Sequence, residues 1–179
     1  NPEKWRLSFH GIKVLGPLQK AKELSDCFLV FGIGSVSNYW KRKEIFQKIE
    51  ISEDRFETII HPSASISRFA HINTGSVIFQ NVTITSNAKI GKFVYVLPNS
   101  IISHDATIAD FTCIAGSVCI SGNVHVGQGC YIGSNSTIKD GLRIEDDCLI
   151  GMGSVVIRNI PENTVVIGNP ANFLRNSHS

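Results

Sequence analysis

The chain contains 179 residues, of which 42% are hydrophobic and 18% are charged, values typical of a folded globular protein and not of a disordered one. Its 17 basic and 15 acidic side chains give a net charge of +2, and the basic residues form no run. We therefore expect no nucleic-acid partner and no attraction to a membrane surface. No apolar run is long enough to cross a bilayer.

The chain begins at Asn1–Trp5 with neither a methionine nor a signal-peptide pattern, and we expect this N-terminus to be incomplete. The cysteines are odd in number and show no Cys-x-x-Cys spacing: Cys27, Cys113, Cys119, Cys130 and Cys148. Free thiols of this kind are typical of a reducing compartment, so the sequence predicts a cytoplasmic protein.

Residues 1–58 are expected to form a small Rossmann-like α/β unit. The predicted elements are a strand, a short helix, an apolar run that ends in glycines and a second helix, at residues 11–16, 17–24, 27–34 and 37–49. This order is typical of units in which a ligand phosphate meets a helix N-terminus. The pair Gly32 and Gly34 lacks the third glycine of the dinucleotide fingerprint and also fits a tight turn. So small a unit buries little core, so we expect it to be truncated or to pack on the rest of the chain.

Residues 59–179 are governed by a repeat of six residues. Every sixth residue from Ile60 to Val156 is Ile or Val, and the residue four positions after each is small or medium in size. A period of six is neither helical nor that of a simple strand, and it describes a short flat strand followed by a corner. Three such units close a triangular coil, and stacked coils lie about 4.8 Å apart. Glycines follow the aliphatic residue where we expect a turn with positive φ: Gly91, Gly127, Gly133 and Gly151.

His104 and Asp105 lie where a regular coil needs no histidine. A neutral histidine can take a proton from an attacking amine or hydroxyl, and an acidic partner can fix its tautomer. Adjacent residues on a strand face opposite ways, so the pair can cooperate only if the backbone turns there or if Asp105 reaches another subunit. A solvated turn would contain the same two residues, and the residues alone leave both interpretations open.

The surrounding motifs resemble those of one family of hexapeptide-repeat enzymes. The chain contains His61-Pro-Ser-Ala64 at the entry to the repeats, residues 102–110 and 121–127 around the histidines, and Gly168-Asn-Pro-Ala171 near its end. These motifs resemble the sialic acid O-acetyltransferases and nucleotide-amino-sugar N-acetyltransferases, over about residues 11–174. The resemblance implies a left-handed parallel β-helix, a homotrimer, acetyl-CoA between two subunits and a nucleotide-sugar substrate in glycan or surface-polysaccharide biosynthesis.

The same resemblance implies roles for individual residues. His104 would be the general base and Asp105 its partner, and the N–H of Gly122 would stabilise the oxyanion. Gly34 and Ser35 match the loop that contacts the nucleotide sugar. The positions that match the cofactor site are Cys113, Gly122, Ser134, Met152, Asn169, Pro170 and Ala171.

The sequence departs from the family pattern in two places. Many relatives have a second histidine where Cys113 stands, and a thiol cannot replace its hydrogen bond to the thioester end of the cofactor. The relatives also begin with a strand and a glycine-rich turn that precede the part matching Asn1, so we expect sugar binding to be impaired.

The leading interpretation is acetyl transfer from acetyl-CoA to an amino group of a nucleotide-linked deoxysugar, without a covalent enzyme intermediate. Alternatives are O-acetylation of a sugar hydroxyl, transfer of a longer acyl chain from acyl carrier protein, and a non-catalytic scaffold. We expect no metal, because a zinc site needs converging ligands and His71, His104 and His125 lack a close pair. Cys130 and Cys148 are expected to be packing residues, and His71 and His125 to face solvent.

Overall fold

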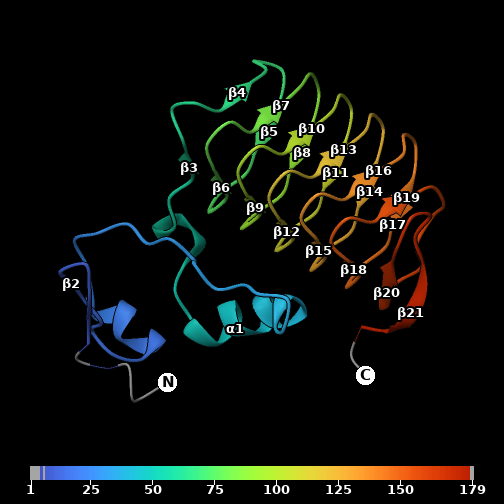
Figure 1. Ribbon diagram of the computed structural model, residues 1–179. Helices are drawn as coiled ribbons and strands as arrows, with labels where there is room; N and C mark the ends of the chain where they lie inside the picture. The colour runs from blue at the N-terminus through green and yellow to red at the C-terminus, as the bar shows by residue number, and fades with distance from the viewer. Residues whose placement is uncertain (1–4, 6, 178–179) are drawn as a thin grey trace.

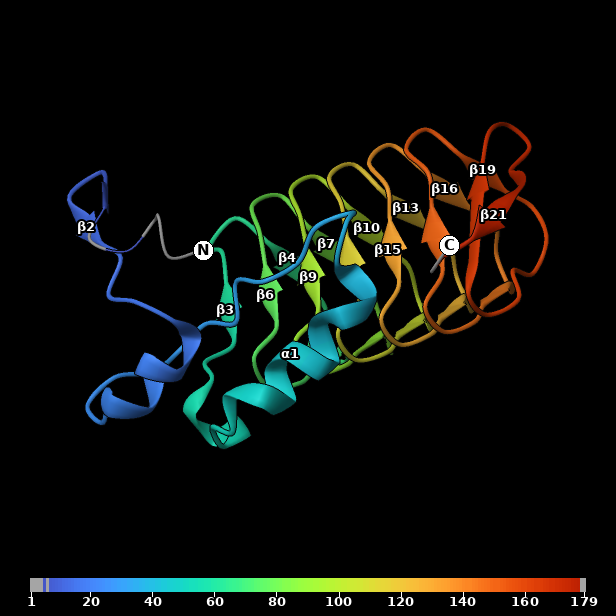
Figure 2. The same cartoon turned by 90° about the horizontal axis from the view of Figure 1, so that it is seen from below.

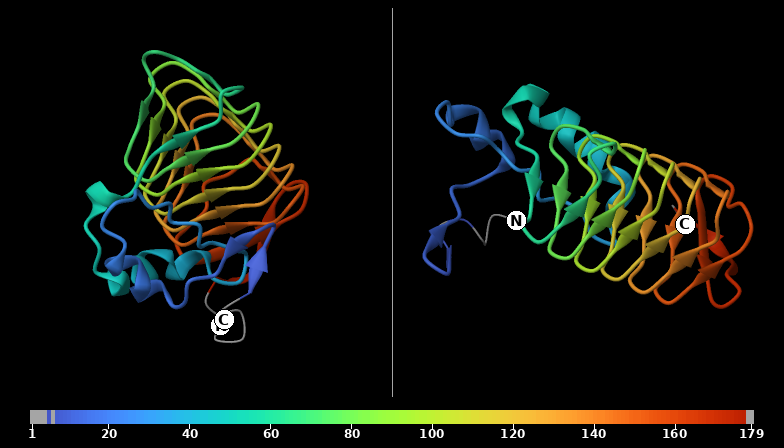
Figure 3. Two further views of the ribbon diagram at one scale, coloured as in Figure 1. Left: turned by 90° about the vertical axis from the view of Figure 1, so that its left-hand side faces the viewer. Right: turned by 90° about the horizontal axis from the view of Figure 1, so that it is seen from above.

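The structure is a computed structural model that describes residues 5 and 7–177, and its main body is a solenoid of short parallel β-strands (Figure 1). The expectation of an incomplete N-terminus falls on residues 1–5, of which residues 1–4 lie outside the described residues, as do residues 6, 178 and 179. The chain is mainly β, and its coils stack into a prism with three faces, each made by one sheet (Figure 3).

Within each sheet, neighbouring strands come from successive coils, except that β21 pairs antiparallel with β20. The eight-stranded sheet contains β3 (Ile59–Ile60), β6 (Val77–Ile78), β9 (Tyr95–Val96), β12 (Cys113–Ile114), β15 (Tyr131–Ile132), β18 (Leu149–Ile150), β20 (Thr164–Ile167) and β21 (Asn172–Asn176). The six-stranded sheet contains β4 (Ser65–Ile66), β7 (Thr83–Ile84), β10 (Ile101–Ile102), β13 (Cys119–Ile120), β16 (Thr137–Ile138) and β19 (Val155–Val156). The five-stranded sheet contains β5 (His71–Ile72), β8 (Lys89–Ile90), β11 (Thr107–Ile108), β14 (His125–Val126) and β17 (Arg143–Ile144).

The register confirms the coil of eighteen residues that the repeat predicts. Ile102 pairs in parallel with Ile84 on one side and with Ile120 on the other. The predicted aliphatic column is buried from Ile78 to Val156, whereas Ile60 in the first coil remains 45% exposed. Burying each such side chain contributes about 1.5–3 kcal/mol, so this column stabilises the solenoid along its length.

The smaller inward column contains mostly apolar side chains and a few hydroxyls, which find partners inside the prism. Ser76 donates to the carbonyl of Gly91 at 2.8 Å, and Thr112 donates to that of Gly127 at 2.8 Å. A buried hydroxyl without a partner would destabilise the core, and these bonds remove that penalty.

The expectation that the glycines after the aliphatic residues supply a positive φ is wrong. The left-handed residues lie two positions later, for example at Phe93 and Asn135. Lack of space explains the glycines instead. A Cβ on Gly133 would lie 2.6 Å from the carbonyl oxygen of Ile150 in the next coil, and one on Gly127 would lie 2.7 Å from the backbone nitrogen of Asp146.

The part of the chain before β3 does not confirm a Rossmann-like unit. Its described residues form an antiparallel pair, β1 (Ser8–Phe9) with β2 (Ile12–Lys13), and one α-helix, α1 (Arg42–Ile49). Short 3-10 helices occupy Leu18–Glu23, Tyr39–Lys41 and Glu53–Arg55. The apolar run at residues 27–34 forms no strand and makes a single parallel bridge, between Leu29 and Phe56.

The helix α1 lies beside the solenoid (Figure 2), and an aromatic cluster packs it against one corner. Phe93 and Phe111 occupy left-handed turn positions between the five-stranded and eight-stranded sheets, where other coils have small or polar residues. The ring of Phe46 from α1 lies 4.3 Å from that of Phe93 and 5.7 Å from that of Phe111. The segment that leads into α1 is thereby held against the eight-stranded sheet.

Candidate functional site

The turn between β10 and β11 brings the imidazole of His104 and the carboxylate of Asp105 together. His104 Nδ1 lies 2.8 Å from Asp105 Oδ2. Asp105 has a φ of +60°, so the backbone turns at this residue and both side chains can project outward from the same corner. The local turn required for the pair to cooperate is therefore present within one chain.

The hydrogen bonds of Asp105 fix which nitrogen of His104 is free. The His104 hydrogen bond, followed by one from Asn87 Nδ2 to Asp105 Oδ1 at 3.1 Å, holds the pKa of the carboxyl below its usual range. An ionised carboxylate only accepts hydrogen bonds, so Nδ1 of His104 is the donor. Nε2 is then the ring nitrogen that can take up a proton. The His104 side chain is 61% exposed, so incoming molecules can reach it.

Gly122 lies directly against this imidazole from the next coil. A Cβ at Gly122 would lie 2.6 Å from both Cε1 and Nε2 of His104, so only glycine leaves room for the ring. The Gly122 carbonyl accepts a hydrogen bond from the Gly141 N–H at 2.9 Å, whereas its own N–H has no backbone partner among the described residues. The predicted base and the predicted oxyanion donor are therefore neighbours.

Gly34 and Ser35 lie elsewhere, against the eight-stranded sheet. A Cβ at Gly34 would lie 3.1 Å from the Sγ of Cys113 in β12. The N–H of Ser35 donates to Asn38 Oδ1 at 2.8 Å, which shapes the loop. A cavity of about 740 Å³ opens here, with Trp40 on its wall. Cys113 itself is only 6% exposed, and burial raises the pKa of its thiol.

The structure also reveals a buried cation that the sequence analysis missed. Arg42 of α1 is fully buried, and it donates from Nε to the carbonyl of Ile33 and from Nη1 to that of Phe111, both at 2.6 Å. Its guanidinium carbon lies 4.4 Å from the ring centre of Tyr95. Arg42 therefore ties the residue before Gly34 to the corner of the solenoid. No sequence signal marks this arginine, because its partners are backbone carbonyls.

Ser134 and Met152 line a largely apolar groove that continues from this cavity along the eight-stranded sheet. The groove encloses about 590 Å³, and it shares Val36 and Tyr131 with the cavity at Gly34. Gly168, which directly precedes the predicted tail residues, also lines the groove. In that tail, Asn169 and Pro170 are exposed, whereas the N–H of Ala171 donates to the carbonyl of Val155 at 2.8 Å.

The predicted site residues therefore form two groups that one chain keeps apart. His104, Asp105 and Gly122 occupy the corner between the six-stranded and five-stranded sheets. In a three-sided prism this corner lies opposite the eight-stranded sheet, which carries Cys113, Ser134 and the groove. Within one chain the two groups therefore do not meet.

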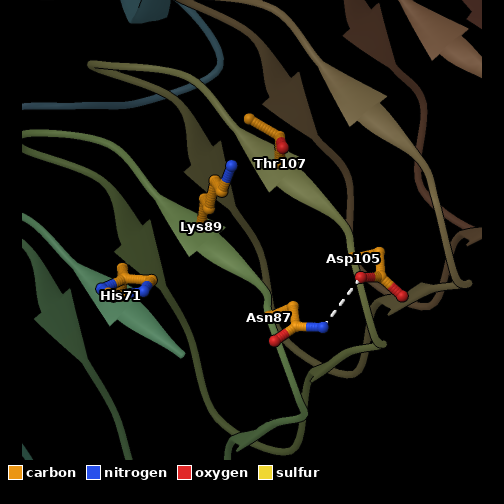
Figure 4. Close-up of a pocket in the computed structure, with 5 residues that line it drawn as sticks. All are labelled: His71, Asn87, Lys89, Asp105 and Thr107. Carbon is orange, nitrogen blue, oxygen red and sulfur yellow. Dashed lines mark hydrogen bonds between the residues drawn. The ribbon is translucent and has the colours of Figure 1, made fainter. Parts of the chain in front are cut away.

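A further cavity lies beside the pair on the five-stranded sheet (Figure 4). It encloses about 430 Å³, and it is lined by His71, Asn87, Lys89, Asp105 and Thr107. From the sequence, His71 was expected only to face solvent, and Lys89 was not predicted to take part in a site. No group of three His, Cys, Asp or Glu side chains that could hold a metal occurs in residues 5 and 7–177. None of the helices in that part of the chain is long and apolar enough to cross a membrane.

Comparison with known proteins finds the same repeat and the same architecture. Residues 123–158 match the family described as the hexapeptide repeat of succinyl-transferase. A GDP-perosamine N-acetyltransferase of Escherichia coli is 32% identical over 134 residues, which cover 75% of this chain and 52% of that protein. The chain thus spans about half the length of this curated relative.

Two solved structures resemble the fold closely. A mutant of perosamine N-acetyltransferase from Caulobacter crescentus, in complex with CoA and GDP-perosamine, has a TM-score of 0.83 at 22% identity, over 95% of this chain and 81% of its own. The acetyltransferase domain of PglB from Neisseria gonorrhoeae, in complex with acetyl coenzyme A, also has a TM-score of 0.83, at 24% identity, over 93% and 81% of the two chains.

Proposed function

We propose that the chain is a hexapeptide-repeat acetyltransferase related to the nucleotide-amino-sugar N-acetyltransferases, and that it transfers an acetyl group from acetyl-CoA to an amino group of a nucleotide-linked deoxysugar. The relatives are named for transfer to GDP-perosamine or were crystallised with CoA or acetyl-CoA. On the basis of the family resemblance, we also propose that the coil is left-handed and that the protein acts in glycan or surface-polysaccharide biosynthesis. The free cysteines support a cytoplasmic location.

The hydrogen bond between His104 and Asp105 is the observation that carries this proposal. It leaves Nε2 of His104 exposed and free to accept a proton. An amine on a sugar must lose a proton as it attacks the thioester carbonyl, and Nε2 is proposed to take that proton. The same nitrogen then returns the proton to the sulfur of the departing CoA, so the protons balance over one turnover.

The N–H of Gly122 is proposed to stabilise the negative charge that develops on the carbonyl oxygen during transfer. It lies next to the His104 ring and has no backbone partner among the described residues. Donors aimed at such an oxygen are each worth about 10²–10³ in kcat. Because His104 and Gly122 share one turn column, the base and the oxyanion donor would act on the same carbonyl.

The groove along the eight-stranded sheet fits a long, mixed polar and apolar cofactor. Acetyl-CoA is proposed to lie there with Ser134 and Met152 beside its arm and Asn169, Pro170 and Ala171 near its nucleotide. The Gly34–Ser35 loop, against Cys113, is proposed to contact the nucleotide sugar. These groups lie opposite His104 within one chain. A homotrimer with sites between subunits would bring the corner of one prism to the groove of the next.

The proposal is tested by incubating the protein with acetyl-CoA and a panel of nucleotide-linked sugars, each amino sugar paired with its hydroxyl analogue. We expect CoA release only with an amino sugar. Release only with the hydroxyl analogue would show O-acetylation instead. Failure to bind acetyl-CoA by calorimetry would favour a non-catalytic scaffold.

A further inference from the structure

The groove proposed for acetyl-CoA and the cavity at Gly34 meet at two residues, Val36 and Tyr131, which line both spaces. Ser134 and Met152 line the groove alone, and Gly34 lines the cavity alone. An amine must come within about 3.5 Å of the thioester carbonyl before it can attack. With the cofactor in the groove and the acceptor in the cavity, the acyl group therefore has to lie where the two spaces join, beside Val36 and Tyr131.

The ring of Tyr131 is held in place at this junction. Tyr131 belongs to β15, and its partners in the parallel register are Cys113 on one side and Leu149 on the other. Its ring centre lies 6.0 Å from that of Tyr39, and the two ring planes are inclined by 52°. The half-buried ring also packs against the cluster that contains buried Tyr39 and Leu149. Tyr131 therefore provides a fixed wall for a group bound at the junction.

The eight-stranded sheet is covered beyond Tyr131, on the side of β12. Cys113, the partner of Tyr131 in that direction, is only 6% exposed. Gly34 lies over it, because a Cβ at Gly34 would be 3.1 Å from its Sγ. Val36, two residues further along the same loop, carries a branched side chain with little rotational freedom. An acyl chain longer than acetyl would therefore displace Tyr131 or Val36, or enter the space proposed for the acceptor.

We propose that Tyr131, together with Val36, limits the transferred acyl group to about the size of acetyl. This inference rests on the proposed function and deepens it, because it names the residues that select the donor. An apolar pocket discriminates by about 10–200-fold between ligands that differ by one methylene group. Butyryl-CoA has a longer acyl chain than acetyl-CoA and is excluded on this account, whereas removal of the Tyr131 ring makes room for it.

Calorimetric titration with acetyl-CoA and with butyryl-CoA tests this limit without an acceptor. We expect wild type to bind butyryl-CoA about tenfold more weakly than acetyl-CoA, and Tyr131→Ala to bind the two within about twofold of each other. Tyr131→Phe should keep the wild-type ratio, since the ring and not the hydroxyl fills the space. Val36 is 53% exposed, so Val36→Ala should fold normally and should reduce the preference for acetyl-CoA even if Tyr131→Ala does not fold.

Met152→Ala is the matched control for these titrations. Met152 is 81% exposed, and it lines the groove but not the cavity at Gly34. Its replacement should change the affinity for both thioesters alike and leave their ratio as in wild type. Equal affinity of wild type for the two thioesters overturns the proposal. A preference for acetyl-CoA that both Tyr131→Ala and Val36→Ala leave unchanged also overturns it.

Acyl transfer to a nucleotide-linked amino sugar separates the acyl limit from the proposed function. A wild-type protein that acetylates the sugar but binds and transfers butyryl equally well retains the function and refutes the limit. A preference for acetyl-CoA that depends on Tyr131, in a protein that acetylates no such sugar, supports the limit and contradicts the proposed function.

Discussion

Gly122→Ala should disable the base without removing it. The backbone at Gly122 lies outside the left-handed region, so alanine can adopt its conformation. The added methyl group would lie 2.6 Å from Cε1 and Nε2 of His104, whereas ordinary contacts begin at 3.4 Å. The imidazole must therefore move by about 0.8 Å or rotate, which breaks its alignment with Asp105.

The size of the expected effect follows from this displacement. A misplacement of about 1 Å costs about 10²-fold in rate, and a general base contributes about 10²–10⁴ in total. We therefore expect kcat to fall about 10²-fold. The unfolding free energy should change by less than about 0.5 kcal/mol, because the exposed His104 ring can move into solvent. Alanine keeps the N–H proposed to stabilise the oxyanion, so a loss of rate reports on His104.

The assay combines steady-state acetyl transfer with calorimetric titration of acetyl-CoA and with thermal unfolding. Gly116→Ala provides a stability control at the same turn position of a neighbouring corner, where a Cβ would lie 3.4 Å from the Pro98 carbonyl oxygen. Both variants should unfold like wild type, and Gly122→Ala should still bind acetyl-CoA. A Gly122→Ala protein with wild-type kcat would refute the role given to His104.

Three further predictions concern packing and burial. Gly127→Ala should destabilise the protein by about 1–3 kcal/mol in thermal unfolding, because its Cβ meets backbone of the next coil, and equal stability to Gly116→Ala would contradict this. Arg42→Ala should raise hydrogen exchange in residues 28–56 but not in the solenoid, since it releases two carbonyls, each bond worth about 1.5–3 kcal/mol. Iodoacetamide should modify Cys113 more slowly than exposed Cys27 near neutral pH, because burial raises the pKa of Cys113 and lowers its thiolate fraction. Raising the pH should accelerate the modification of Cys113. Equal modification rates of the two cysteines, measured by peptide mass spectrometry, would contradict the burial of Cys113.

The solenoid could be predicted from the sequence because each coil repeats the same pattern of inward aliphatic and small residues. The aliphatic period fixes strand, corner and coil length together, and the register of Ile102 with its neighbours follows from it. The part before β3 has no repeat. Its conformation depends on contacts with Phe93 and Phe111, which lie far along the chain. Local sequence patterns therefore predicted more strand structure than this part of the chain contains.

Only part of the candidate site could be predicted from the sequence. His104 and Asp105 were identified, and the asparagines one coil before and after Asp105, Asn87 and Asn123, share its left-handed φ and could have indicated the turn. The outward residues His71 and Lys89, which line the cavity beside the pair, could not be predicted from the six-residue period, because that period marks only inward positions. Outward residues eighteen positions apart lie next to each other on adjacent strands, as His71 and Lys89 do.

The most direct test of the account compares wild type with His104→Ala in acetyl transfer to a nucleotide-linked amino sugar. We expect wild type to form the N-acetylated sugar with stoichiometric release of CoA. His104→Ala should lose about 10²–10⁴ in kcat while its affinity for acetyl-CoA is unchanged. Turnover by His104→Ala at the wild-type rate would contradict the central claim.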